Sequence, residues 1–161
     1  MPESKPIRRG IVFYVKTVAE DYLQAAHSLL EKGCFFGSVV VLCCSAFESA
    51  SKWKIRFLLK RTSKMTNSQI DCHLNRIQGN QKRPLVFRIA DELEKLYGNN
   101  IRDKLLALSY WNDLDAMVKM RNKVVHTGFI GTGAIPTKED AHKYLNVSRK
   151  IVAFMNKEIV I

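Results

Sequence analysis

The chain has 161 residues, 47% of them apolar, and carries 26 Lys and Arg against 15 Asp and Glu. This length lets one domain bury a continuous core without disulfides or metal, and the apolar share excludes a disordered chain. The formal net charge of +11 predicts attraction to polyanions such as nucleic acid, although a basic surface kept for solubility explains it as well. We expect a mobile basic arm over residues 1–10 and a single domain over residues 11–161.

The cysteines and the lengths of the apolar runs indicate in which cellular compartment the protein is expected. Cys34, Cys43, Cys44 and Cys72 have no C-x-x-C spacing. We interpret them as small, reduced core residues, with neither a metal nor a disulfide. No run approaches the roughly 18 apolar residues of a membrane span, and the N-terminus lacks the apolar segment of a secretory leader. These features predict a cytoplasmic protein with no membrane partner, and we expect no cofactor.

The first half of the chain shows helical spacing, and no segment alternates as a strand with a hairpin signal. Helices are predicted over 11–32 and 36–61. The second contains the run SVVVLCCSAF, which is apolar nearly all round, so we expect it to be the central, most buried helix. A short helix near 70–77 lies between polar loops, and Pro84 suits the first turn of a helix over 84–97.

The second half continues the helical pattern. Asn100 is predicted to cap a short helix over 100–108, and a longer helix is expected over 110–127. After a glycine-rich loop, Thr137 and Asp140 resemble a capping box for a last helix that ends near residue 160. The glycines of the loop do not match a phosphate-binding fingerprint, since no strand precedes them. The chain is therefore predicted to be an all-α, up-and-down bundle of about five or six helices.

The helix predicted over 110–127 carries an arginine among its apolar residues. At about 100° per residue, Arg121 falls in the middle of the apolar stripe. That stripe contains Tyr110, Leu114, Met117, Val118, Val124 and Val125. A buried arginine cannot lose its proton, so it requires an anion. One candidate is Glu48, which shares an apolar face of the helix over 36–61. The other is a phosphate of a substrate, which a guanidinium binds through two parallel hydrogen bonds.

Polar residues near Arg121 suggest a site for such a phosphate. His126 and Asn122 are four residues apart and share one edge of the helix, whereas Arg121 and His126 are five apart. Arg121 and His126 can reach one phosphodiester if the site lies over that edge or if the helix unwinds at Thr127 and Gly128. An imidazole moves a proton there and a guanidinium offsets the phosphate charge. On the solvated face, Lys119 and Lys123 are candidates for binding the backbone of a nucleic acid such as RNA.

The segment RNKVVH, residues 121–126, fits the R-x(4 to 6)-H motif of the HEPN superfamily. These helical-bundle proteins occur among toxins, antiviral effectors and RNA-processing enzymes. The polar residue after the arginine and the position near the end of a late helix also resemble the family. The resemblance implies a metal-independent endoribonuclease that dimerises with its motif helices facing each other. It nominates Arg121 and His126 as catalytic and Asn122 as supporting, whereas Glu48 is added from its helical face alone.

The implied chemistry suits a two-fold assembly. Attack of the ribose 2′-hydroxyl on the adjacent phosphate needs a base for the hydroxyl proton and an acid for the leaving oxygen. One motif supplies one histidine, and a two-fold axis supplies a second copy of His126. RNA and a second copy of the chain are therefore the expected partners. The resemblance also implies a nucleotidyltransferase-like antitoxin as a possible neutralising partner.

Three other interpretations stay open. Arg121 and Glu48 form a purely structural pair in the first, and His126 is then a histidine favoured by the helix dipole. In the second, the protein keeps the HEPN-like fold and binds RNA or a protein without catalysis, for example within a toxin–antitoxin pair. In the third, Lys119 and Lys123 lie on a DNA-reading helix, although no short helix-turn-helix pair is present.

The remaining polar and aromatic residues give weaker signals. Three histidines have no ligand partner at metal spacing and read as surface or boundary residues: His27, His73 and His142. Four aromatic residues at helical spacing read as core: Phe47, Trp53, Phe57 and Trp111. A basic run at the end of the helix over 36–61 either tracks an RNA backbone or is a solvated helix end. That run comprises Lys52, Lys54, Arg56, Lys60 and Arg61.

Overall fold

Seven helices make up the part of the chain that the computed structural model describes, residues 6–79, 82–127 and 135–160. They are α1 (Pro6–Glu31), α2 (Phe36–Thr62), α3 (Asn67–Gly79), α4 (Leu85–Tyr97), α5 (Ile101–Leu106), α6 (Trp111–Thr127) and α7 (Lys138–Glu158). The predicted all-α bundle is confirmed, with one helix more than the five or six expected. Helix α1 begins within the stretch that the sequence assigned to an arm, and residues 1–5 lie outside the described residues.

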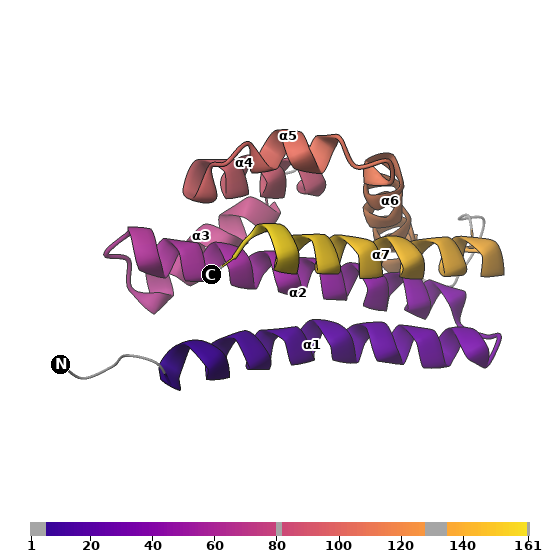
Figure 1. Cartoon of the computed structure of the whole chain (residues 1–161). Helices are drawn as coiled ribbons and strands as arrows, with labels where there is room; N and C mark the ends of the chain where they lie inside the picture. The colour runs from indigo at the N-terminus through magenta and orange to yellow at the C-terminus, as the bar shows by residue number, and fades with distance from the viewer. Residues whose placement is uncertain (1–5, 80–81, 128–134, 161) are drawn as a thin grey trace.

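Helix α2 is the centre of the bundle, as its nearly continuous apolar surface predicts. It packs against α1, α3, α4, α6 and α7. The three long helices α1, α2 and α7 run side by side, and α4 and α5 lie across the top of the view, above α2 and α7 (Figure 1). Helix α6 runs at a steep angle to α2 and α7 (Figure 1). This crossing places α6 against both α2 and α4, which is the arrangement that forms the site described below.

Two of the helix ends test the side-chain caps that the sequence predicts. The predicted capping box of α7 is confirmed: the Thr137 hydroxyl accepts from Asp140 N at 3.1 Å, and Thr137 N donates to the Asp140 carboxylate at 3.0 Å. The predicted side-chain cap by Asn100 is wrong. Asn100 is left-handed, with φ 54°, and makes no side-chain cap bond, because a capping side chain needs an extended backbone to reach the first turn.

The cysteine prediction holds for two of the four residues. Cys43 and Cys44 are buried, and the Cys44 thiol lies 3.6 Å from the main-chain oxygen of Met117. Burial raises the pKa of Cys43 to about 12, so this thiol stays protonated and unreactive. Cys34 is half-buried, and Cys72 is exposed because α3 turns Ile70 and Leu74 inward instead. All four thiols are free.

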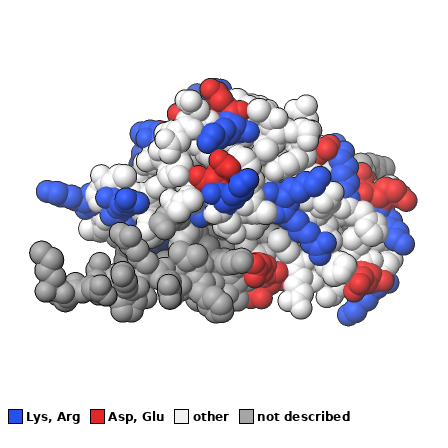
Figure 2. Space-filling view, in the orientation of Figure 1, with Lys and Arg blue, Asp and Glu red and all other residues white. Residues whose placement is uncertain are grey.

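The surface matches the high net charge. On the face drawn in Figure 2, Lys and Arg are spread over the molecule and outnumber Asp and Glu, without gathering into one patch. Among the helices of the described residues, none is both long and apolar enough to cross a bilayer. Because the charge on this face is dispersed, a specific site has to be sought in the local geometry.

Candidate functional site

An open groove with a volume of about 480 Å³ lies between α6 and the segment that begins α4. From α3 and the start of α4 its lining comprises Gln78, Arg83, Pro84, Leu85 and Arg88. From α6 it comprises Asp115, Val118, Lys119, Arg121, Asn122 and His126. The lining thus holds three arginines, one lysine and one carboxylate, besides a histidine. Such a set of charges suits an anionic ligand.

The α6 wall is built by helical periodicity. Asp115, Lys119, Asn122 and His126 follow one another at spacings of three or four residues, so they share one face of the helix. Lys119 is held on this face by an ion pair with Asp115 at 2.6 Å. The structure therefore brings Lys119, Asn122 and His126 to the same groove as Arg121. Lys123 is exposed and does not line it.

Arg121 meets the internal anion that the helical faces of the sequence suggested. Its Nη2 donates to Oε1 of Glu48 on α2 at 2.5 Å, with the two side chains 23% and 15% exposed. The Nε of Arg121 is buried and has no hydrogen-bond partner in the described part of the chain. One side of the guanidinium is thus compensated by Glu48, while a further donor remains unused. A buried donor without a partner is uncommon and calls for an explanation.

The apolar stripe around Arg121 is shorter than predicted. Leu114, Met117 and Val118 are buried, but Val124 is only half-buried and Val125 is 57% exposed. The prediction that Val125 belongs to the packed stripe is therefore wrong. Apolar residues continue at helical spacing into the last turns of α6, but these turns are no longer covered by other helices. Apolar side chains there are therefore partly or largely exposed. His126, next in the chain, is also exposed.

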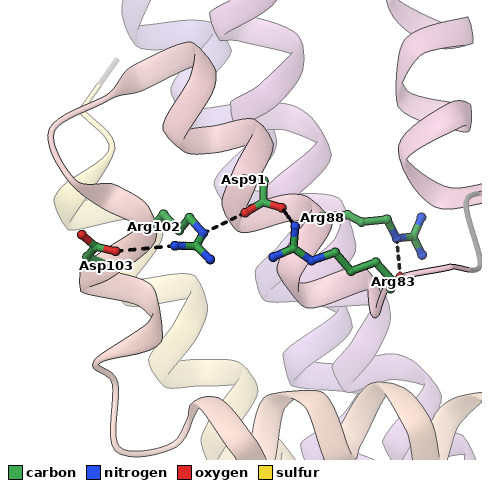
Figure 3. A network of polar contacts seen from close by, with 5 residues as sticks. All are labelled: Arg83, Arg88, Asp91, Arg102 and Asp103. Carbon is green, nitrogen blue, oxygen red and sulfur yellow. Dashed lines mark hydrogen bonds and ion pairs between the residues drawn. The ribbon is translucent and has the colours of Figure 1, made fainter.

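The opposite wall borders an arginine network that sequence reasoning missed (Figure 3), and Arg83 and Arg88 of this network line the groove. Asp91 accepts from Arg83 and, at 2.8 Å, from Nε of Arg102. Arg88 Nε donates to the main-chain oxygen of Arg83 at 2.8 Å, and its guanidinium points away from Asp91 (Figure 3). No local signal marks Arg88, because the spacing of α4 places it opposite Ile89, Ala90 and Leu93. Only the approach of α6 makes it part of a groove.

The basic run at the end of α2 is not one surface. Lys54 is 6% exposed, and its Nζ donates to the main-chain oxygen of Ile159 at 2.8 Å. Burial lowers the pKa of Lys54 to about 8. Arg56 is tied to Asp71 of α3, whereas Lys60 and Arg61 are exposed. The interpretation of Lys54 as part of an RNA track or a solvated helix end is therefore wrong, because it lies on the inward face of α2.

The aromatic prediction holds for two of four residues, whereas the prediction that His27, His73 and His142 are surface or boundary residues is confirmed. Phe47 and Trp111 are buried, as predicted for core residues, whereas Trp53 and Phe57 are only half-buried. Among the histidines outside the groove, His73 is partly buried and lies 2.8 Å from a Glu92 oxygen. No group of three or more His, Cys, Asp or Glu in the described residues is arranged to hold a metal ion.

The groove combines three chemical abilities. Guanidinium groups bind phosphate oxygens, an imidazole takes or gives a proton, and the amide of Asn122 both donates and accepts hydrogen bonds. No protein-family model matches the chain, and neither a curated protein nor a solved structure matches it.

Proposed function

We propose that this protein is a metal-independent endoribonuclease of the HEPN type, with its active site at a homodimer interface. The single observation that carries the proposal is the groove that gathers Arg121, Asn122 and His126 within a lining rich in cations. A buried, unpartnered Nε on Arg121 adds to this support, because a guanidinium donor without a partner can bind a phosphate oxygen.

The proposed reaction needs only these side chains and RNA. The 2′-oxygen bonds to the adjacent phosphorus while the bond from phosphorus to the 5′-oxygen breaks. One imidazole takes the proton of the 2′-hydroxyl, and another gives a proton to the leaving 5′-oxygen. The products are a 2′,3′-cyclic phosphate and a 5′-hydroxyl end. Arg121 stabilises the charge that develops on the equatorial phosphate oxygens.

A dimer supplies the second imidazole. Within the described lining of the groove, His126 is the one histidine, so one chain offers one group for proton transfer. It lies next to the exposed Val125 in the last described turns of α6. A two-fold axis beside this turn covers the exposed valine and brings His126 of the partner subunit to the same phosphate. The two histidines then share the base and acid roles.

The ion pair between Arg121 and Glu48 favours a second candidate, a non-catalytic HEPN-like module that binds RNA or a protein. Because Glu48 already compensates Arg121, the arginine has a structural role even without a substrate. A groove of the same charge then binds RNA without cutting it. The two candidates differ in whether RNA is cleaved.

The test is incubation of the purified protein with structured and single-stranded RNA in EDTA. We expect cleavage that leaves cyclic phosphate ends, and a rate about a thousandfold lower for His126→Ala, the size typical of acid–base catalysis. His142→Ala is the matched control, since His142 is an exposed histidine of α7 outside this groove, and we expect its rate within about twofold of wild type. Equal cleavage by His126→Ala contradicts the proposal, and binding without cleavage by wild type supports the module.

A further inference from the structure

Arg88 is one of three arginines that line the groove, together with Arg83 and Arg121. Its Nη1 is buried without a hydrogen-bond partner, and no carboxylate of the described residues pairs with it. Arg121, in contrast, has Glu48. Burial removes part of the hydration of the Arg88 guanidinium and thereby lowers its pKa. An arginine nevertheless stays charged near neutral pH, so this desolvated charge favours an incoming anion.

The surroundings hold Arg88 in position. Its Nε donates to the carbonyl of Arg83, and the Arg83 side chain is itself anchored to Asp91, which also binds Arg102 (Figure 3). This network leaves the outer part of the Arg88 guanidinium directed away from Asp91, and Arg88 lines the groove. Since the side chain is already ordered, a ligand that binds it loses little side-chain entropy.

We propose that Arg88 binds the phosphate that neighbours the scissile phosphate in a single strand of RNA lying in the groove. The inference rests on the proposed function. Arg121 and His126 share the α6 wall, so the phosphate on which they act lies against that wall. Arg88 belongs to the facing α4 wall of the same groove, so we assign to it the next phosphate along the strand. A single strand has a flexible backbone and unstacked bases, so two walls can hold successive phosphates.

The length of the substrate provides the test. A dinucleoside monophosphate has only the scissile phosphate, whereas a tetranucleotide also has neighbouring ones. For the tetranucleotide we expect Arg88→Ala to raise KM about tenfold and to leave kcat unchanged, the pattern of lost uniform binding. For the dinucleoside monophosphate we expect equal rates. Arg102→Ala is the control, because it removes one charge from the same network but does not line the groove.

Binding of an uncleavable strand provides a second measurement. With a 2′-O-methyl oligonucleotide, we expect Arg88→Ala to weaken affinity about tenfold and to reduce the slope of log K against log salt by about 0.7, the loss of one phosphate contact. Arg88→Gln keeps a donor near the Arg83 carbonyl and serves where Arg88→Ala does not fold. An affinity unchanged in the folded Arg88 variants overturns the inference. Equal losses for duplex RNA overturn the assignment of a single strand.

The two proposals fail in different ways. If wild type cuts RNA and the Arg88 variants match it on both substrates, the role of Arg88 is wrong while the proposed function stands. If wild type binds RNA without cutting it and the Arg88 variants bind more weakly, the nuclease proposal is wrong while the phosphate site stands. If wild type neither binds nor cuts RNA, both are overturned.

Discussion

Two cations lie among apolar residues of this bundle, Arg121 of α6 and Lys54 of α2, and their charges are met differently. Arg121 donates to the Glu48 carboxylate at 2.5 Å. Lys54 donates at 2.8 Å to the carbonyl of Ile159, and no carboxylate of the described residues pairs with it. A guanidinium keeps its proton, so it needs an anion, whereas an ammonium can release its proton when desolvated. Burial accordingly lowers the pKa of Lys54 to about 8.

The difference separates two roles for a buried cation. Arg121 keeps a full charge at the edge of a groove, where a phosphate can approach it. Lys54 lies in the core, where its hydrogen bond links α2 to Ile159, the residue after the end of α7. It is not among the described residues that line the groove. A cation on an apolar face therefore indicates a functional site only when it keeps its charge and borders open space.

The largest expected effect comes from reversing the charge of Glu48. In Glu48→Lys a second cation faces Arg121, and we expect the free energy of unfolding to fall by about 4 kcal/mol, the cost typical of an uncompensated buried charge. Asp71→Lys makes the same change in the exposed pair with Arg56 and should cost less than about 1 kcal/mol. Chemical denaturation measures both. Similar losses for the two variants contradict the contrast between a buried and an exposed pair.

Glu48→Gln sharpens the same test without adding a charge. We expect a smaller loss of stability and, well below the melting temperature, slower RNA cleavage, because a neutral amide oxygen holds the Arg121 guanidinium less strongly than a carboxylate does. If cleavage per folded molecule stays at the wild-type rate, Glu48 serves stability alone.

The second-largest expected effect is the pH dependence that Lys54 gives to the free energy of unfolding. Its folded pKa of about 8 lies below the ordinary 10.5, so between these values the unfolded chain binds a proton that the folded chain does not. The stability due to this group therefore rises from pH 8 to 10.5, by up to about 3 kcal/mol. The difference in the free energy of unfolding between wild type and Lys54→Met, measured at each pH, isolates this rise. It also cancels the opposite trend of Cys43, whose raised pKa removes stability above pH 9.0. A flat difference would falsify the assignment.

The smallest expected effect is a difference in RNA affinity between substitutions at two lysines of α6. Lys119 lines the groove and Lys123 does not. We expect Lys119→Ala to weaken RNA binding about threefold at moderate salt, and Lys123→Ala to weaken it less than about twofold, since exposed charges act through a screened field. Titration with a labelled uncleavable RNA measures the two affinities. A larger loss for Lys123→Ala places the RNA on the other face of the helix.

Helix boundaries could be predicted from the sequence where apolar periodicity and capping residues marked them. Helix α2 was expected over 36–61 and spans Phe36–Thr62, and α6 was expected over 110–127 and spans Trp111–Thr127. Periodicity and capping depend on contacts within a few residues, so the sequence contains them directly. Arg121 and Glu48 were found in the same way, because each lies on an apolar face of its own helix.

The inward position of Lys54 follows from its helical spacing. Phe47, Ser51, Lys54 and Leu58 follow at spacings of four, three and four, and all four are buried. The basic residues beside Lys54 in the sequence lie on other faces of α2, so they do not form one surface with it. A helix sorts residues by every third or fourth position, so neighbours in the sequence point in different directions.

The sequence by itself determined the helices, the capping box of α7 and the need of Arg121 for an anion, since each depends on residues within one helix. The tertiary structure decided which anion meets Arg121, where the apolar stripe of α6 stops being covered, and that Arg88 faces the same groove. These features depend on how α2, α4 and α6 pack. Packing joins faces of helices that are far apart in the chain, and no local spacing specifies which faces meet.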